Sequence, residues 1–509
     1  MSQEVLSQAE EKFERIRKQT GLILAPVVFC AIWLLPIASL SDKAHALFAV
    51  LGLVVTLWVT EAIPLAATSL LGTALCIVLG IAPAREVLRG FADPVIFLFL
   101  GSFLLAEAML KHGLNRRVAF QLLGLRWVGE SPFALLLVFG VITGGISMWI
   151  SNTATTAMMF PIGVSILTEM ARMKSHRDGR EIRYTDLRYG TGLMLMTAFA
   201  ASVGGLATPV GTPPNLIGIG IFERTTGVKI HFFQWMLFAF PLTVAMVAFL
   251  VFYLGRRCPA EPGLMRGSGE WIRIERQKLG RFSTAQIHVL IAFALTVTFW
   301  VLPGIFTLIQ GNESPLAASM NQRLPEAVVS LLGALLLFVL PVRWRGAQGE
   351  ATLVWRDAKA VDWGTILLFG GGLALGDLMF STGLARWLGE GVAGAMGADS
   401  TFALVVLFTF AAAFVSETSS NTASASMVVP VAISVAQAAG VNPLQPALAA
   451  CLGASMGFML PVSTPPNAIV YGSGCVPLRQ MIRHGFALDI VGCLMIIATV
   501  WWIVPLVLN

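Results

Sequence analysis

Two short polar segments occur twice in this chain, and each copy interrupts apolar sequence. The first copy has Ser-Asn-Thr at residues 151–153 and Thr-Pro-Pro-Asn at 212–215. The second has Ser-Asn-Thr at 420–422 and Thr-Pro-Pro-Asn at 464–467. A Pro-Pro pair removes two amide donors and cannot continue a helix from the preceding turn. Each Thr-Pro-Pro-Asn therefore predicts a broken helix.

Such breaks are restrictive because the chain is strongly apolar. Of 509 residues, 56% are hydrophobic and 12% are charged, which is typical of a polytopic membrane protein. In hydrocarbon every backbone amide needs a partner, so a broken helix is tolerated only where it lines a polar cavity. Paired breaks in two halves of a chain are typical of the binding sites of secondary transporters.

Eleven apolar runs are long enough to predict transmembrane helices. They are 22–40, 44–60, 65–82, 94–111, 187–207, 233–254, 285–309, 324–342, 364–382, 444–461 and 484–507. Two further pairs of runs, 132–149 with 154–171 and 401–415 with 423–438, each surround one Ser-Asn-Thr. A polar pivot between short apolar arms favours a re-entrant hairpin over two complete spans.

The distribution of basic residues supports this topology. With the amino terminus inside and both hairpins re-entrant, 27 of the 34 Lys and Arg residues lie on the cytoplasmic side. The net charge of +6 is therefore interpreted as loop charge, and no nucleic-acid partner is expected. We predict a multi-pass protein of the cytoplasmic membrane.

An internal repeat relates the two halves. Residues 99–114 resemble 369–384 at an offset of 270, and Ser-Asn-Thr recurs at an offset of 269. Because the two copies begin on opposite sides of the predicted membrane, the repeat is inverted, as in many secondary transporters. Two amphipathic stretches, 113–129 and 383–397, are predicted to be interfacial arms.

The repeated segments hold hydroxyls and amides but no Lys, Arg or His. An anion there would rely on helix N-termini and on bound cations, and oxygen ligands suit sodium. This favours a cation-coupled anion site. Glu417, beside the second Ser-Asn-Thr, has two interpretations: its carboxylate accepts backbone amides, or it takes part in proton coupling. No H-E-x-x-H, G-x-S-x-G or Walker A motif supports an enzyme.

The paired motifs, the inverted repeat and the length resemble the divalent anion:sodium symporter family, over residues 22–508. The resemblance implies a homodimer whose protomers each combine a scaffold with a mobile domain that moves as an elevator. Carried onto this chain, the scaffold comprises 1–129 and 282–398, and the transport domain comprises 130–281 and 399–509.

The resemblance also implies two Na⁺ sites and a substrate site. The residues implied for sodium are Ser147, Ser151, Asn152 and Gly211 in the first site, and Ser416, Ser420, Asn421 and Ser463 in the second. Those implied for substrate are Ser151, Asn152, Thr153, Thr212, Pro213, Ser420, Asn421, Thr422, Thr464 and Pro465. The expected function is sodium-coupled symport of C4-dicarboxylates such as succinate, malate and fumarate. A sodium-independent dicarboxylate or citrate exchanger, a sulfate transporter and an anion channel are the alternatives.

Overall fold

The computed structural model describes residues 8–129, 131–264, 268–310, 314–342, 350–396 and 400–508. Helices dominate this part of the chain. The α-helices of the first half are α1 (Gln8–Leu34), α2 (Asp42–Thr60), α3 (Leu65–Val78), α4 (Ala84–Val87), α5 (Pro94–Lys111), α6 (Leu114–Leu123), α7 (Pro132–Ser147), α8 (Asn152–Asp178), α9 (Arg188–Gly204), α10 (Pro213–Thr226), α11 (Phe232–Arg257) and α12 (Ser268–Lys278). Those of the second half are α13 (Thr284–Gln310), α14 (Pro315–Arg323), α15 (Glu326–Val339), α16 (Trp363–Ser381), α17 (Leu384–Met396), α18 (Thr401–Thr418), α19 (Asn421–Ala438), α20 (Leu444–Gly453), α21 (Pro465–Tyr471), α22 (Leu478–Ala498) and α23 (Val504–Leu508). Short helical turns are η1 (Leu88–Ala92), η2 (Arg126–Val128), η3 (Tyr184–Asp186), η4 (Gly205–Ala207), η5 (Trp355–Ala360) and η6 (Thr499–Ile503).

The helices confirm a multi-pass membrane protein. Among the described residues, ten helices are long and apolar enough to cross a membrane, or eleven if α14 and α15, bent by 59°, form one span. These helices do not correspond one to one to the eleven apolar runs that the sequence predicted as spans. By length, α8 and α18 qualify although the sequence assigned them to hairpins, whereas α3 and α20 are shorter. The re-entrant topology therefore stays a prediction.

Both predicted helix breaks are confirmed. The helix α9 ends at Gly204, the backbone is extended at Thr212, and α10 begins at Pro213. In the second half α20 ends at Gly453 and α21 begins at Pro465. In both copies the two prolines occupy the first positions of the new helix, where a missing amide proton has no intrahelical partner to lose.

The predicted boundaries of the first span differ from the structure. The sequence predicted 22–40, but α1 covers Gln8–Leu34. The helix ends shortly before Pro36 because a proline disfavours helical geometry in the residue that precedes it. At its other end the helix extends well into the polar amino-terminal segment, which an apolar window does not detect.

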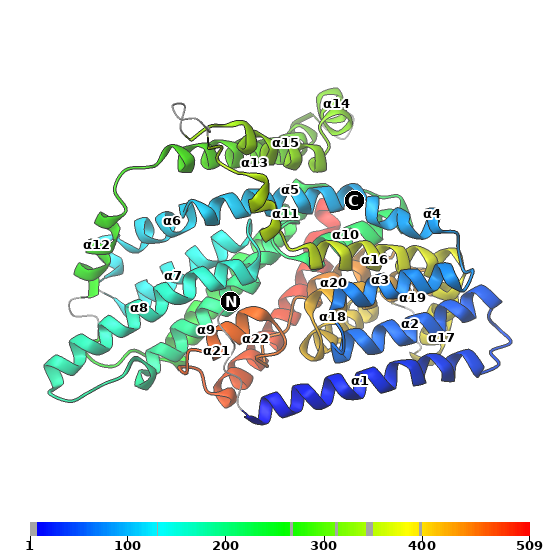
Figure 1. Cartoon of the computed structure of the whole chain (residues 1–509), viewed down its shortest axis with the longest axis horizontal. Helices are drawn as coiled ribbons and strands as arrows, with labels where there is room; N and C mark the ends of the chain where they lie inside the picture. The colour runs from blue at the N-terminus through cyan, green and yellow to red at the C-terminus, as the bar shows by residue number, and fades with distance from the viewer. Residues whose placement is uncertain are drawn as a thin grey trace.

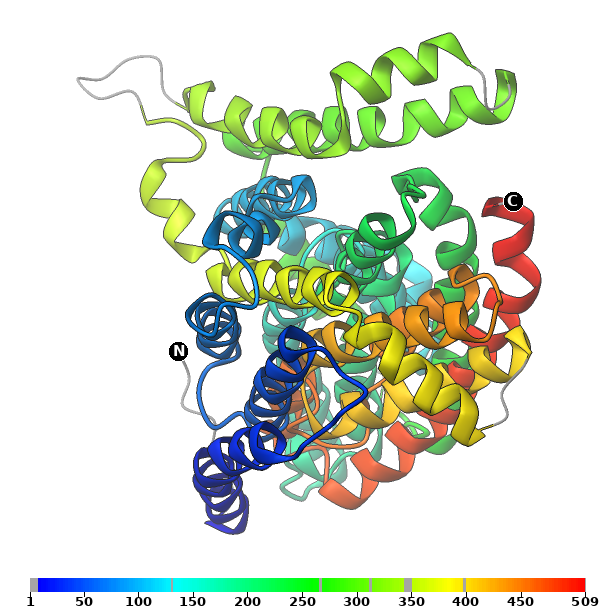
Figure 2. The same cartoon turned by 90° about the vertical axis from the view of Figure 1, so that its right-hand side faces the viewer.

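Two groups of helices lie against each other, joined by the packing of α19 on α16 and α17 (Figure 1). In one, α2 packs on α1 and α3, α16 packs on α3, and α15 packs on α5. In the other, α9 packs on α7 and α8, and α20 packs on α18 and α19. The helices α13, α14 and α15 form a separate layer at the top of Figure 2. The two predicted arms are helical as α6 and α17, and each follows a glycine with positive φ, Gly113 or Gly383. Residue 397 of the second arm lies outside the described residues.

Candidate functional site

The first polar turn, residues 147–153, is called the first tip below. Ser151 caps α8, and its Oγ accepts a hydrogen bond from the Ala154 amide at 3.3 Å. Serine favours this position because its oxygen satisfies an amide that lacks a helical partner. Across the turn, the Ser147 hydroxyl donates to Asn152 Oδ1 at 2.9 Å. The tip is thus closed by its own side chains and presents their remaining oxygens.

The first break, residues 205–215, is held in place by one amide side chain. Asn215 is fully buried, and its Nδ2 donates to the carbonyls of Gly205 at 2.9 Å and Thr208 at 2.8 Å. These carbonyls lost their helical donors where α9 ended, and a buried unpaired carbonyl is costly. Asn152 Nδ2 reaches Thr212 Oγ1 at 3.4 Å, so the first tip and the first break are in contact.

The second tip, residues 416–422, repeats these contacts. Ser420 caps α19 by accepting from the Ala423 amide at 3.1 Å, and the Ser416 hydroxyl donates to Asn421 Oδ1 at 2.7 Å. In the second break, residues 457–467, Asn467 Nδ2 donates to the carbonyl of Gly457 at 3.3 Å and to that of Leu460 at 3.0 Å. The contacts of the tips recur at an offset of 269 residues and those of the breaks at an offset of 252, as expected for an internal repeat.

Glu417 distinguishes the second copy. Its carboxylate is buried and accepts from the amides of Phe458 at 2.6 Å and Met459 at 2.9 Å and from the Ser463 hydroxyl at 2.7 Å. The interpretation that Glu417 accepts backbone amides is confirmed by these contacts, and proton coupling stays untested. Because three donors converge on Glu417, this side chain holds the second break against the second tip.

Replacing Glu417 by Ala is expected to lower the melting temperature of the purified protein and to reduce transport by roughly tenfold or more. A hydrogen bond to a charged group contributes about 1.5–3 kcal/mol, and three are lost. Glu417→Gln is the control, since its amide oxygen can still accept from Phe458 and Met459. It should retain much of the stability. A Gln variant as unstable as the Ala variant would contradict this positioning role.

A point between the tips and breaks gathers oxygen atoms in each copy. A Cβ added at Gly205 would lie closer than 3.0 Å to Asn152 Oδ1 and 3.1 Å from the Gly211 carbonyl oxygen. A Cβ added at Gly457 would lie 3.1 Å from Ser416 Oγ and 3.3 Å from Asn421 Oδ1. The missing side chains of two repeat-related glycines thus allow amide, hydroxyl and carbonyl oxygens to cluster close to the backbone. Uncharged oxygens of this kind are hard ligands, so the donor set fits a small cation such as sodium.

The structure brings some of the predicted residues together and separates others. Ser147, Asn152 and Thr212 are joined by hydrogen bonds, as are Ser416 and Asn421. The hydroxyl of Ser463 instead donates to the backbone carbonyl and the carboxylate of Glu417. Thr153 is exposed and Thr422 is half-buried, and among the described residues neither hydroxyl makes a hydrogen bond within the protein. These two threonines remain available to a ligand.

The halves interlock across the repeat. Helix α21, which starts at the second break, packs against α8 of the first tip, and α10, which starts at the first break, packs against α19 of the second tip. The Cys451 thiol of α20 also donates to the carbonyl of Pro214 at 3.2 Å. The helices of the two copies are therefore interleaved, and in the first copy the N-termini of α8 and α10 meet at the contact of Asn152 with Thr212, where their dipoles favour negative charge.

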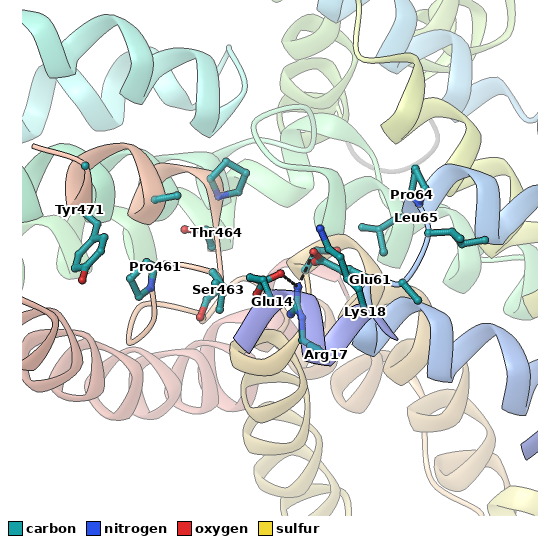
Figure 3. Close-up of a pocket in the computed structure, with 17 residues that line it drawn as sticks. Glu14, Arg17, Lys18, Glu61, Pro64, Leu65, Pro461, Ser463, Thr464 and Tyr471 are labelled. Atoms are coloured by element: carbon teal, nitrogen blue, oxygen red, sulfur yellow. Dashed lines mark hydrogen bonds and ion pairs between the residues drawn. The ribbon is translucent and has the colours of Figure 1, made fainter. Parts of the chain in front are cut away.

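A cavity of about 640 Å³ opens beside the second break (Figure 3). Ser420, Thr464 and Pro465, all predicted substrate residues, line one side. The opposite side is formed by α1 and by the turn between α2 and α3, and its charged side chains are Glu14, Arg17, Lys18 and Glu61. The sequence did not single out Arg17 or Lys18, because both precede the first apolar run.

The charges in this cavity largely cancel. Arg17 is bonded to Glu14 at 2.9 Å and to Glu61 at 3.0 Å, as the dashed lines in Figure 3 show. Lys18 adds one positive charge and the second carboxylate one negative charge. Glu61 is the one non-glycine residue of the described chain with positive φ, 46°, and it ends α2 in the left-handed region. The backbone therefore leaves the helix at Glu61, and the Glu61 carboxylate reaches Arg17.

Comparison with known proteins gives a consistent result. Residues 17–508 match the family model described as the sodium:sulfate symporter transmembrane region. A protein of Staphylococcus saprophyticus named sodium-dependent dicarboxylate transporter SdcS is 34% identical over 503 residues, covering 98% of the chain and 94% of the relative. Its namesake from Staphylococcus aureus (strain USA300) is 33% identical over 493 residues, covering 96% and 92%.

Two solved transporter structures share the fold at low identity. The YdaH transporter of Alcanivorax borkumensis superposes with a TM-score of 0.52 at 13% identity and covers 82% of this chain and 87% of its own. The Neisseria gonorrhoeae protein MtrF, described with a class of antimetabolite efflux pumps, gives 0.51 at 14% identity and covers 88% and 94%. At such identities the likeness shows the fold alone.

Proposed function

Because the chain belongs to the sodium:sulfate symporter family, we propose that it is a sodium-coupled symporter of C4-dicarboxylates such as succinate, malate and fumarate. The relatives named sodium-dependent dicarboxylate transporters support the coupling ion and the substrate class. The protein is a membrane transporter and not an enzyme. We place it in the cytoplasmic membrane with its amino terminus inside.

The observation that carries the proposal is the pair of oxygen clusters beside Gly205 and Gly457. Of the three heavy atoms nearest to a Cβ at each glycine, none belongs to a basic side chain, so a dianion beside these clusters needs its positive charge from elsewhere. Sodium bound by Ser147, Asn152 and the Gly211 carbonyl in the first half would supply it. Ser416, Ser420 and Asn421 would hold the second ion, with the backbone near Ser463.

Substrate carboxylates would then contact the free hydroxyls and amides of the two tips. We assign this role to Ser151, Asn152, Thr153, Ser420, Asn421 and Thr422, with Thr212, Pro213, Thr464 and Pro465 lining the cavity. The helix N-termini of α8 and α19 point their unpaired amides toward the same region and add to the field of the ions. Since the field depends on both cations, substrate binding is coupled to sodium.

We further propose that the protein works as a homodimer by an elevator mechanism. The scaffold would comprise 1–129 and 282–398, and the mobile domain 130–281 and 399–509. Helices α1, α2 and α3 pack together within the proposed scaffold, and α7, α8 and α9 within the proposed mobile domain, whereas α17 and α16 of the scaffold pack on α19 of the mobile domain. Contacts across the division would have to break during movement; they include Arg224 with Asp93 at 2.9 Å and the Phe232 amide with Glu326 at 2.6 Å.

Uptake of labelled succinate into proteoliposomes tests the function. We expect accumulation above the external concentration when an inward sodium gradient is present and none when choline replaces sodium. Uptake that does not depend on sodium but requires a dicarboxylate loaded inside the proteoliposomes would show that the protein is an exchanger. A parallel thermal-shift screen with succinate, citrate and sulfate, each with sodium and with choline, identifies the preferred anion.

The two kinds of tip residue should give different kinetic phenotypes. Thr153→Ala or Thr422→Ala should raise the succinate concentration for half-maximal uptake by roughly tenfold, the effect of losing one hydrogen bond to a charged group. Ser147→Ala or Ser416→Ala should mainly raise the sodium concentration required for half-maximal uptake. These two hydroxyls contact Asn152 and Asn421, whose oxygens belong to the clusters proposed to bind sodium. If all four variants altered only the succinate dependence, this division of roles would be wrong.

A further inference from the structure

A second cavity, of about 400 Å³, lies far along the helices from the tips, where α9 and α22 begin and α11 ends. Its walls include the side chains of Arg188, Arg256, Arg257 and Arg483. All four arginines fall in segments that the charge distribution predicts to be cytoplasmic. The cavity therefore opens where the helices would leave the membrane toward the cytoplasm.

The guanidinium groups around this cavity have no carboxylate partner in the part of the chain that the structure describes. Within the described residues, none of these four arginines forms an ion pair, and no Asp or Glu lines the cavity. By contrast, Arg17 and Arg224 each contact two carboxylates. Four like charges around one space repel one another, and the N-terminus of α22 adds further positive potential, whereas the Arg188 amide at the start of α9 already donates to Glu261 Oε1 at 2.6 Å. An anion bound among the four guanidinium groups would reduce this repulsion.

The cavity has an ordered polar floor. His484 is buried, its Nδ1 lies 3.1 Å from the Tyr253 hydroxyl, and its Nε2 lies 3.1 Å from Gln480 Oε1. The Tyr253 ring also meets the His484 ring edge to face, and the Arg257 guanidinium lies 6.0 Å from the centre of the Tyr253 ring. These contacts fix the floor and orient one of the four guanidinium groups.

Apolar side chains continue the surface from the cavity toward the membrane. Phe252, one turn from Arg256, is 52% exposed, and the Arg256 guanidinium lies 5.8 Å from the centre of its ring. Phe486, three residues after Arg483, is 55% exposed. A ligand that contacts both the arginine-lined cavity and these two phenylalanines would have an anionic head group and an apolar body. Basic pockets between transmembrane helices on the cytoplasmic side commonly bind the head groups of anionic lipids.

We propose that this cavity is a binding site for the phosphate head group of an anionic phospholipid, whose acyl chains lie along Phe252 and Phe486. Guanidinium groups suit phosphate because their planar donors bind its oxygens in pairs. The site lies at the ends of α11 and α22, away from both tips. It does not depend on which anion the protein carries, so its failure would leave the proposed transport function standing.

The test measures binding of fluorescent phosphatidylglycerol to the full-length protein in phosphatidylcholine nanodiscs. The double variant Arg256→Gln/Arg483→Gln should bind the lipid roughly tenfold more weakly or worse. The matched control Arg172→Gln/Arg183→Gln removes two arginines from the same predicted side but outside the cavity, and should bind like the unchanged protein. Equal losses in both double variants would reduce the effect to net charge and overturn the proposal.

Two further arms use the unchanged protein, so they do not depend on the folding of a variant. Inorganic phosphate at the same concentration as the lipid should displace little of it; complete displacement would mean a soluble-anion site and overturn the lipid assignment. Photo-cross-linking with a phosphatidylglycerol that carries a reactive head group should label peptides containing residues 188–191, 256–258 or 480–484. Labelling spread evenly over the other helices would also overturn the proposal.

Discussion

Gly205→Ala is expected to abolish sodium-driven uptake. The added methyl group would lie closer than 3.0 Å to Asn152 Oδ1 and 3.1 Å from the Gly211 carbonyl oxygen, so it would displace oxygens assigned to the first sodium ion. The backbone of Gly205 has φ −60°, which alanine adopts readily, so the effect comes from these displaced oxygens and not from backbone strain. Displacing Asn152 also breaks the contact between the first tip and the first break. We expect uptake to fall roughly 100-fold or more, which corresponds to about 3 kcal/mol.

Alanine substitutions at two other glycines provide a control and a case with an intermediate effect. Gly145 lies two residues before the first tip, and a Cβ there meets nothing within 4 Å, so Gly145→Ala should transport normally. At Gly457 the nearest atoms to an added Cβ are Ser416 Oγ at 3.1 Å and Asn421 Oδ1 at 3.3 Å, a tight fit without overlap. Gly457→Ala should therefore remain active but need roughly tenfold more sodium. The measurement is the sodium dependence of succinate uptake; unchanged dependence in Gly205→Ala would rule out the cation site.

The sequence predicted the helix breaks well because their cause is local. Two adjacent prolines determine where α10 and α21 begin, whatever surrounds them. The ends of the preceding helices were predicted less well. The apolar run 444–461 was expected to be helical throughout, but α20 ends at Gly453. The amides of Phe458 and Met459 that this leaves free are satisfied by Glu417, about 40 residues earlier in the chain. Such a tertiary contact leaves no trace in an apolar window.

In the candidate site, too, contacts within one turn agree with the sequence, whereas contacts between distant segments were missed. The family resemblance placed Ser147 and Asn152 in one sodium site, and the structure brings their side chains into contact at 2.9 Å. Gly205 was not singled out, because its importance lies in a missing side chain that faces oxygens of two other segments. Arg17 was missed for a related reason: its partner Glu61 ends a different helix, 44 residues away. Local motifs reveal which residues are polar at membrane depth, while the fold decides which of them meet.

The elevator mechanism predicts that a covalent link between the two proposed bodies stops transport. Gly372 of α16 belongs to the proposed scaffold and Ser426 of α19 to the proposed mobile domain, and a Cβ on Gly372 would lie 3.3 Å from the Ser426 Cβ. Cβ atoms of disulfides are typically about 3.8 Å apart, so Gly372→Cys with Ser426→Cys should cross-link after a small adjustment. Oxidation should abolish succinate uptake, and dithiothreitol should restore it.

A cross-link of the same geometry within the scaffold is the matched control. A Cβ on Gly333 of α15 would also lie 3.3 Å from the Cβ of its neighbour, Thr296 of α13, and both residues belong to 282–398. Both pairs would be made in a Cys30→Ser background, since Cys30 is the exposed cysteine of the described chain. Oxidation of Gly333→Cys/Thr296→Cys should leave uptake intact, because this link joins helices that are proposed to stay together. If the oxidised Gly372→Cys/Ser426→Cys protein, with its link confirmed by loss of maleimide labelling, still carried succinate, α16 and α19 would not move apart and the elevator division would have to be redrawn.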